Sequence, residues 1–367
     1  MLGYSSGEQP GSADSVKLNT NENPYPPSPN VLKAGTKFQY NNLRLYPDGN
    51  ADGLRKAISQ LHSVSPTNVL ATRGGDELLR LLVTTFVDPG EKIGMTYPTY
   101  SLYQVLAEIQ DCPIESVELN SDWRVPDHFA SDMNDSGVKL CFLVNPHAPT
   151  GTFTSKAKIE EIADELDSIL VVDEAYIDFI EDQLQSCIDL IPRHDNLIVL
   201  RTMSKGYSLA GLRVGYGIAQ EELIHPMLTK TKDSYNLDQI SQAIATCALE
   251  DQEHKRKCSA LIKASRNKLQ EGLEKLGLPV SPSQANFLLV TIPDRFQLTA
   301  YDLYKELKTK NIFVRYFNMP RLEDKLRISV GLPEQNKKLI KILEPLLYRP
   351  KCSNQPVMKK PNLRYWF

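Results

Sequence analysis

Residues 197–215 read LIVLRTMSKGYSLAGLRVG and carry the clearest structural signal in the chain. The segment opens with apolar residues, which predict a short buried strand. Lys205 follows that strand among small and hydroxyl side chains, and Arg213 comes eight residues later, between glycines. A lysine at the end of a buried strand faces a cleft, where it can lose its proton and act as an amine nucleophile. Burial statistics alone favour a solvated loop lysine, so neighbouring motifs must decide.

A second apolar run, residues 170–172, ends at Asp173. Ligands of open α/β sheets bind at the carboxyl ends of the strands, so we expect Asp173 and Lys205 at the same edge. Pyridoxal 5'-phosphate needs a lysine for covalent attachment and a carboxylate facing its pyridinium nitrogen. Its phosphate needs cationic groups and backbone N–H groups, and Arg213 can supply the charge. The three residues therefore fit one cofactor.

Both motifs resemble those of the aspartate aminotransferase superfamily, the fold-type-I pyridoxal-phosphate enzymes. They are Ser204-Lys205, Gly211-Leu212-Arg213 and Asp173-Glu174-Ala175-Tyr176. Further segments resemble the histidinol-phosphate aminotransferase family, namely residues 18–26, 43–48, 73–77, 314–317 and 326–331. The resemblance extends from about Leu18 to Leu347. It implies an α/β fold of type I, with a mainly parallel mixed sheet in a large domain, a small α+β domain, and pyridoxal 5'-phosphate as cofactor.

The resemblance also implies a role for each residue that matches a family motif. The implied catalytic residues are Lys205, Asp173 and Tyr176. The implied cofactor contacts within one subunit are Gly75, Asp76, Tyr100, Asn145, Asp173, Tyr176, Ser204, Lys205 and Arg213. Tyr46 is implied to reach the cofactor phosphate of a partner subunit, which makes the protein a homodimer with shared active sites. The implied substrate contacts are Asn23, Arg315 and Arg327.

Several of these positions keep an ordinary structural alternative. The glycines at 74–75 can form a plain turn, Tyr100 can pack at the start of a helix, and the two arginines can pair with acidic side chains. The superfamily usually has an asparagine before Pro-Thr-Gly, where it binds the phenolic oxygen of the cofactor. This chain has Ala148 there, which has no donor, although Tyr176 can still serve that oxygen.

The composition of the 367 residues, 41% hydrophobic and 24% charged, is typical of a soluble globular protein. A net charge of −3 gives no reason to expect nucleic acid or an anionic membrane as a partner. No apolar run approaches the ~20 residues that a membrane-spanning helix needs. The six cysteines are scattered, which predicts reduced thiols and a cytoplasmic location. The six histidines lack metal-ligand spacing, so we expect no metal.

Strand and helix patterns alternate from about residue 68 to residue 220, which predicts a mainly parallel sheet with helices on both faces. A helical pattern extends from Leu237 to about Leu276, and residues 312–315 read as one strand. The predicted parts are a flexible N-terminus (1–16), an arm joined to the small domain (17–42), a large cofactor-binding domain (43–262), the small domain (263–350) and a C-terminal tail (351–367).

These observations favour a transaminase. By resemblance, its substrates are L-histidinol phosphate and 2-oxoglutarate, its products are imidazole acetol phosphate and glutamate, and its place is histidine biosynthesis. An aromatic amino acid aminotransferase and a phosphothreonine decarboxylase of the same fold remain alternatives, because fold does not fix substrate. A regulatory module with an inactive copy of the fold is a third. It would need a nucleic-acid-binding segment, and it would not need Lys205 together with Asp173.

Overall fold

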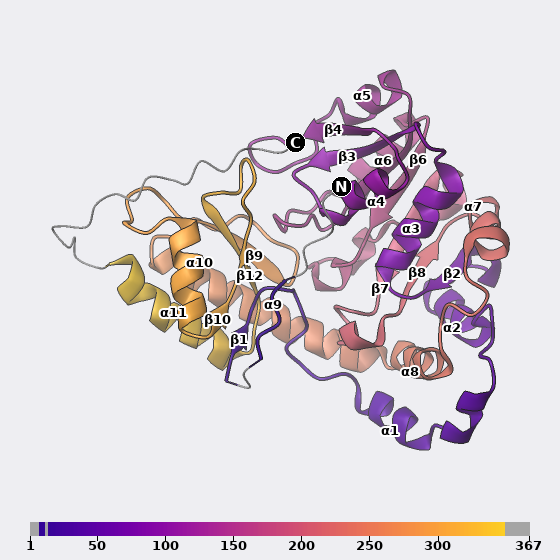
Figure 1. Cartoon of the computed structure of the whole chain (residues 1–367), viewed down its shortest axis with the longest axis horizontal. Helices are drawn as coiled ribbons and strands as arrows, with labels where there is room; N and C mark the ends of the chain where they lie inside the picture. Colours follow the sequence, from indigo (N-terminus) through magenta and orange to yellow (C-terminus); the bar gives the residue numbers. More distant parts are fainter. Residues whose placement is uncertain (1–6, 12–13, 349–367) are drawn as a thin grey trace.

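The computed structural model describes residues 7–11 and 14–348, which form a large α/β part and a smaller α+β part (Figure 1). A seven-stranded sheet with the order β2-β8-β7-β6-β5-β3-β4 forms the centre of the large part. Its strands are β2 (Val69–Thr72), β3 (Lys92–Tyr97), β4 (Ile114–Glu118), β5 (Val138–Val144), β6 (Ile169–Asp173), β7 (Leu197–Thr202) and β8 (Gly215–Ile218). Strand β8 is antiparallel to both neighbours and the other pairs are parallel. The predicted fold class is confirmed.

Alternate residues of the central strands enter different hydrophobic cores, because successive side chains of a strand point to opposite faces. Val172 and Val199 belong to one core, and Val171 and Ile198 belong to the other. Helices therefore cover both faces. They are α2 (Asp52–His62), α3 (Gly75–Phe86), α4 (Leu102–Ile109), α5 (Phe129–Asp135), α6 (Lys156–Glu165), α7 (Glu221–Pro226) and α8 (Gln239–Glu250).

The smaller part joins segments from both ends of the described chain. Its three-stranded antiparallel sheet has the order β11-β12-β9, and a separate pair joins β1 in parallel to β10. The elements are β1 (Val16–Lys17), β9 (Phe287–Thr291), α10 (Ala300–Thr309), β10 (Ile312–Phe313), β11 (Arg315–Tyr316), β12 (Lys325–Ser329) and α11 (Pro333–Leu347). Val16 and Leu18 are buried in the core of this part, so the start of the arm belongs to it.

The helical region after residue 237 differs from the single pattern in the sequence. It breaks at Asp251, whose side chain accepts a hydrogen bond from the backbone N–H of His254 and caps α9 (Gln252–Lys275). An aspartate can satisfy the first N–H groups of a new helix in this way, which favours a break. Helix α9 then links the two parts (Figure 1), because Ile262 belongs to a core of the large part and Leu269 to the core of the small part.

The expected strand at 312–315 is also divided. Residues 312–313 pair with β1, whereas Arg315 and Tyr316 pair with β12 in another sheet. The arm supplies a partner strand that the local pattern cannot reveal. The expected N-terminal segment 1–16 is described only in part, and the expected tail 351–367 lies outside the described residues. In the described part of the chain, no helix combines the length and the apolar character that crossing a membrane requires.

Candidate active site

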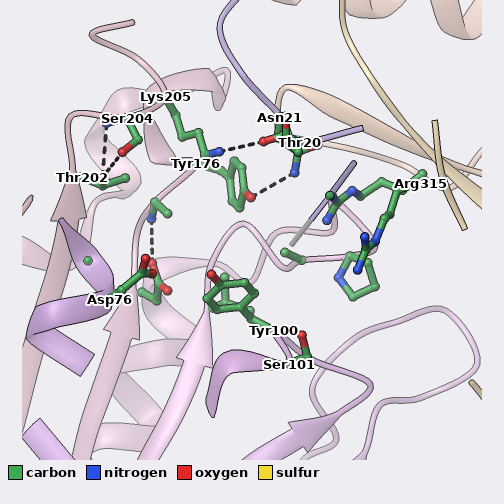
Figure 2. A pocket seen from close by; sticks show the side chains of 18 of the residues that line it. Thr20, Asn21, Asp76, Tyr100, Ser101, Tyr176, Thr202, Ser204, Lys205 and Arg315 are labelled. Carbon is green, nitrogen blue, oxygen red and sulfur yellow. Dashed lines mark hydrogen bonds between the residues drawn. The ribbon is translucent and has the colours of Figure 1, made fainter. Parts of the chain in front are cut away.

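A cavity of about 450 Å³ lies where the carboxyl ends of the central strands meet the arm and the small part. Figure 2 shows Lys205, Ser204 and Asp76 on one side of it and Arg315 on the other. Most of the predicted site residues line this cavity: Gly75, Asp76, Tyr100, Asp173, Tyr176, Ser204, Lys205, Arg213, Arg315 and Arg327. The structure thus brings together residues that are spread over the whole chain.

Lys205 follows β7, and its amine is enclosed by the cavity walls. Its Nζ donates a hydrogen bond to the backbone oxygen of Thr20, at 3.1 Å. Burial lowers the pKa of Lys205 to about 8, and the positive charges of Arg327 and Arg213 act in the same direction. Glu22 and Asp76 oppose that shift in pKa. The neutral form of this amine is therefore far more abundant near neutral pH than that of an ordinary lysine, which favours a role as nucleophile or proton carrier.

Asp173 ends β6 and is only 4% exposed. Its Oδ2 accepts a hydrogen bond from the Tyr103 hydroxyl at 2.9 Å, and its Oδ1 accepts one from the Ala175 N–H at 3.0 Å. Burial raises the pKa of Asp173 to about 6 in spite of these two bonds. A cation beside the carboxylate would offset the cost of burying its charge. The pyridinium nitrogen of pyridoxal phosphate is a cation of this kind.

An anion site lies at the start of α3. Gly74 has a φ of +80°, and a Cβ there would lie 2.7 Å from Nη2 of Arg213, so only glycine fits this close approach. Arg213 donates to Asp76 Oδ2 at 2.9 Å and to Ser204 Oγ at 3.4 Å. A helix N-terminus with a guanidinium and a hydroxyl beside it is suited to a phosphate group.

Arg315 and Arg327 lie directly opposite each other in the register of β11 and β12. The guanidinium groups stack against Phe317, at 5.5 and 5.4 Å from its ring centre, and Arg327 also lies 5.2 Å from Phe287. Arg327 donates to the backbone oxygen of Asn19 at 3.0 Å. Like charges in directly opposed cross-strand positions repel. An anion between them would relieve that repulsion, and the planar guanidinium can bind carboxylate or phosphate with two hydrogen bonds.

Three predicted contacts lie outside the cavity lining. The side chain of Asn145 donates a hydrogen bond to the backbone oxygen of Thr154 at 2.8 Å and accepts one from its backbone N–H at 2.9 Å, so in this structure it holds a loop and does not line the cavity. Asn23 donates to the backbone oxygen of Lys205 at 3.0 Å and thus touches the lysine loop. Tyr46 is 79% exposed and stacks on Tyr235, with 4.5 Å between the ring centres, away from the cavity of its own subunit.

Three residues that contact the predicted site residues are not apparent from the sequence pattern. Tyr103 binds Asp173, as described above, although it reads as a packing residue at a helix start. Asn21 donates to the Tyr176 hydroxyl at 3.0 Å, and Thr202 donates to Ser204 Oγ at 3.0 Å. Asn21 lies in the segment 18–26 that resembles the family, in which the resemblance predicts a substrate contact only for Asn23. No local pattern distinguishes one asparagine from the other.

The donor set of this cavity fits pyridoxal phosphate. A lysine, a buried carboxylate, an anion site and the ring of Tyr100 line one volume. Thr20 and Thr99 also line it, and their buried hydroxyls have no hydrogen-bond partner among the described residues. Among the described residues, no group of three His, Cys, Asp or Glu side chains could hold a metal ion.

Comparison with known proteins agrees with this geometry. Residues 13–343 match the family model "Aminotransferase class I and II". The histidinol-phosphate aminotransferase 1 of Nostoc sp. is 42% identical over 348 residues, which cover 95% of this chain and 96% of the relative. The histidinol-phosphate aminotransferase of Rhodopirellula baltica is 42% identical over 336 residues, 91% of this chain and 90% of the relative.

Among solved structures, the histidinol-phosphate aminotransferase of Sinorhizobium meliloti in complex with pyridoxal-5'-phosphate superposes with a TM-score of 0.85. It covers 91% of this chain and 90% of its own, at 24% sequence identity, and so supports the fold. The assignment to a family rests on the family model and on the closer sequence relatives. The chain belongs to the class I and II aminotransferases, and within them to the histidinol-phosphate aminotransferases.

Proposed function

We propose that this aminotransferase transfers the amino group of L-histidinol phosphate to 2-oxoglutarate, with pyridoxal 5'-phosphate attached to Lys205. The products are imidazole acetol phosphate and glutamate, and the reaction belongs to histidine biosynthesis. The observation that carries the proposal is the pair Arg315 and Arg327 in the same cavity as Lys205 and Asp173. The names of the sequence relatives support histidinol phosphate as the amino donor.

Pyridoxal phosphate, when bound, supplies an electron-withdrawing ring that acidifies the C–H bond of the amino substrate. Lys205 Nζ would remove that proton as general base and, as general acid, deliver it to a carbon of the cofactor instead of returning it to the substrate; a pKa of about 8 suits both roles. Asp173 stabilises a proton on the ring nitrogen. Tyr176 donates its hydroxyl proton to the phenolic oxygen. Arg213, Ser204 and the first amides of α3 hold the phosphate.

Arg315 and Arg327 would bind the anionic end of each substrate in turn. Histidinol phosphate presents a phosphate, and 2-oxoglutarate presents a carboxylate at a comparable distance from the reacting carbon. Arginine can bind either group with two hydrogen bonds, whereas the point charge of a lysine cannot. The same pair therefore serves both halves of the reaction.

We also propose a homodimer with shared active sites. Tyr46 is exposed and lies outside the cavity of its own subunit, among the exposed side chains of Leu43 and Leu45. A partner subunit would cover these apolar groups, and Tyr46 would reach the partner's cofactor phosphate. Mixing Lys205→Ala with Tyr46→Phe subunits should then restore turnover above that of either variant, because each mixed dimer keeps one site free of both changes. Turnover by a strict monomer would contradict the proposal.

A cytoplasmic location completes the proposal. The cysteines of the described residues are free thiols. Cys247 is partly exposed, and the others are buried, namely Cys112, Cys141, Cys187 and Cys258. Reduced thiols are usual where glutathione keeps proteins reduced.

Turnover with a panel of amino donors and 2-oxoglutarate tests the substrate assignment. We expect L-histidinol phosphate to exceed L-histidinol and the aromatic amino acids by at least about tenfold in kcat/KM, because L-histidinol has no anionic end for the arginines and the carboxylate of an amino acid carries less negative charge than a phosphate. Equal use of L-histidinol and its phosphate ester would rule out the phosphate-binding role and favour an aromatic aminotransferase. Release of carbon dioxide from phosphothreonine would favour the decarboxylase.

A further inference from the structure

The N-terminal arm contacts the catalytic tyrosine through Asn21. The amide nitrogen of Asn21 lies 3.0 Å from the hydroxyl of Tyr176, although 155 positions separate the two residues in the chain. Asn21 is 1% exposed, so this bond is shielded from water. Figure 2 shows the bond at the edge of the cavity, beside Lys205. None of the catalytic roles assigned above uses Asn21.

The direction of this hydrogen bond follows from the network behind it. Ser329 Oγ accepts a hydrogen bond from the backbone N–H of Asn21, at 2.9 Å. Its single proton therefore goes to Asn21 Oδ1, also at 2.9 Å. The oxygen of the Asn21 amide thus faces Ser329 and its NH₂ group faces Tyr176. Tyr176 has to accept at that position, so its own proton points away from Asn21.

The backbone around Asn21 is held just as firmly. Asn286 donates to the backbone oxygen of Asn21 at 2.9 Å, and Asn286 is fully buried. Ser329 and Asn286 both belong to the small part of the molecule. The orientation of the Tyr176 hydroxyl therefore depends on the hydrogen bonds between the small part and the arm.

Another residue of the cavity lining, Ala148, makes this orientation more important. Ala148 lines the cavity and is 3% exposed, but its methyl group has no proton to donate. A phenolic oxygen bound near Tyr176 would thus receive its proton from the tyrosine and not from residue 148.

We propose that Asn21 is a positioning residue that directs the hydroxyl proton of Tyr176 into the cavity, toward the phenolic oxygen of the bound cofactor. Asn21 belongs to the cavity lining, and in this proposal it acts through Tyr176, to which its amide is bound. The identity of the acceptor rests on the proposed function, whereas the hydrogen-bond network itself does not.

Asn21→Gly tests the proposal. Asn21 has a φ of +55°, which glycine adopts without strain, so the variant removes the amide and spares the backbone. The readout is the pH midpoint of the visible absorption change of the holoenzyme. A donor to the phenolic oxygen stabilises its ionised form and lowers this midpoint. Losing that well-directed bond should raise the midpoint by about one pH unit.

A double-mutant cycle with Tyr176→Phe separates this effect from a general disturbance. We expect Asn21→Gly to leave the midpoint unchanged in the Tyr176→Phe background. The charged groups around Lys205, namely Arg327, Glu22, Arg213 and Asp76, stay the same in all these variants. An unchanged midpoint in Asn21→Gly alone, or the same rise in the Tyr176→Phe background, would overturn the proposal.

Ser329→Ala is a second variant that leaves the arm sequence intact. It removes the proton that fixes the Asn21 amide, so we expect a smaller rise of the midpoint, again only when Tyr176 is present. A wild-type protein that shows no visible band and no turnover would refute the proposed function. A wild-type protein with a normal band whose midpoint does not respond to Asn21→Gly or Ser329→Ala would refute only the role of Asn21.

Discussion

Two walls of the cavity are built in different ways. The cofactor wall, defined here as Asp173, Ser204, Lys205, Arg213 and the start of α3, comes from the ends of sheet strands and their connections. The substrate wall, defined as residues 19–22 with Arg315 and Arg327, comes from the arm and from the small part. The packing of the central sheet positions the cofactor wall. The contacts of the arm and the small part with the large part position the substrate wall.

The supporting structure differs accordingly. Strands β6 and β7 are buried between two cores, which fixes the residues that follow them. The substrate wall depends on β11, a strand of two residues, and on hydrogen bonds such as that between Asn21 and Ser329, which spans 308 positions. The residues of the cofactor wall therefore lie at the ends of well-packed strands. The residues of the substrate wall lie on segments that take up their positions only when distant parts of the chain meet.

Lys205→Ala should cause the largest loss, because it removes both the attachment point and the proton carrier. We expect turnover to fall by about a thousandfold or more. Borohydride treatment of the wild-type protein should fix the cofactor on Lys205, as peptide mapping would show, and the variant should show no such adduct. The exposed Lys230→Ala is the control and should behave like the wild type. An adduct on another lysine would contradict the cofactor wall described here.

Asp173→Asn should have the next largest effect. The change keeps the shape of the side chain but removes the charge that faces the ring nitrogen, a contribution of about 1.5–3 kcal/mol. Turnover should therefore fall by roughly ten- to a hundredfold. Asp189→Asn, which alters an exposed carboxylate paired with Lys156, is the matched control. Near wild-type turnover of Asp173→Asn would show that this carboxylate does not face the cofactor.

The cofactor wall is also the part that the sequence predicts best. Asp173 and Lys205 each end a short apolar run, so periodicity alone places them at the same edge of a sheet. Glycines at 74–75 before a helix pattern are local signals as well. The structure places Asp173, Lys205 and Gly75 around one cavity.

The substrate wall is predicted only through family resemblance. The pairing of Val16 with Ile312 and the contact of Asn21 with Tyr176 join segments that share no local pattern. For the same reason the local pattern predicts residues 312–315 as one strand and does not distinguish Asn21 from Asn23. The family motif predicts Asn145 as a cofactor contact, whereas in the structure its amide binds the backbone of Thr154. In each case the deciding partner lies outside the local motif.

Arg327→Lys probes the substrate wall and should have a smaller effect than the two changes above. It keeps the charge but loses the planar guanidinium, which should cost about 1–3 kcal/mol of transition-state binding for histidinol phosphate. We expect kcat/KM to fall by roughly five- to a hundredfold, while cofactor occupancy stays unchanged. Arg315→Lys should act in the same direction. Arg295→Lys, in the small part but bound to the backbone of Gly277, is the control. Reduced cofactor occupancy in Arg327→Lys would mean that the two walls are not separate in function.

The smallest expected effect measures how far the substrate wall influences the cofactor wall. Burial is the main cause of the lowered pKa of Lys205, about 8, and the charge of Arg327 is the next. Arg327→Gln removes that charge and should raise the pKa of Lys205 by roughly half a unit to one unit. Only the neutral amine captures the cofactor, so the capture rate of the apoprotein should rise about tenfold per pH unit below the pKa and level off above it.

In the wild type the capture rate should therefore level off near pH 8, and in Arg327→Gln at a higher pH. Arg327→Lys keeps a positive charge and should leave the midpoint close to that of the wild type, which distinguishes an electrostatic effect from lost packing. The direction follows from charge: without the nearby cation, the ammonium form of Lys205 is less unfavourable, so a higher pH is needed to remove its proton. A midpoint that Arg327→Gln does not move would mean that burial and the other nearby charges set the pKa of Lys205, and that Arg327 does not tune the lysine.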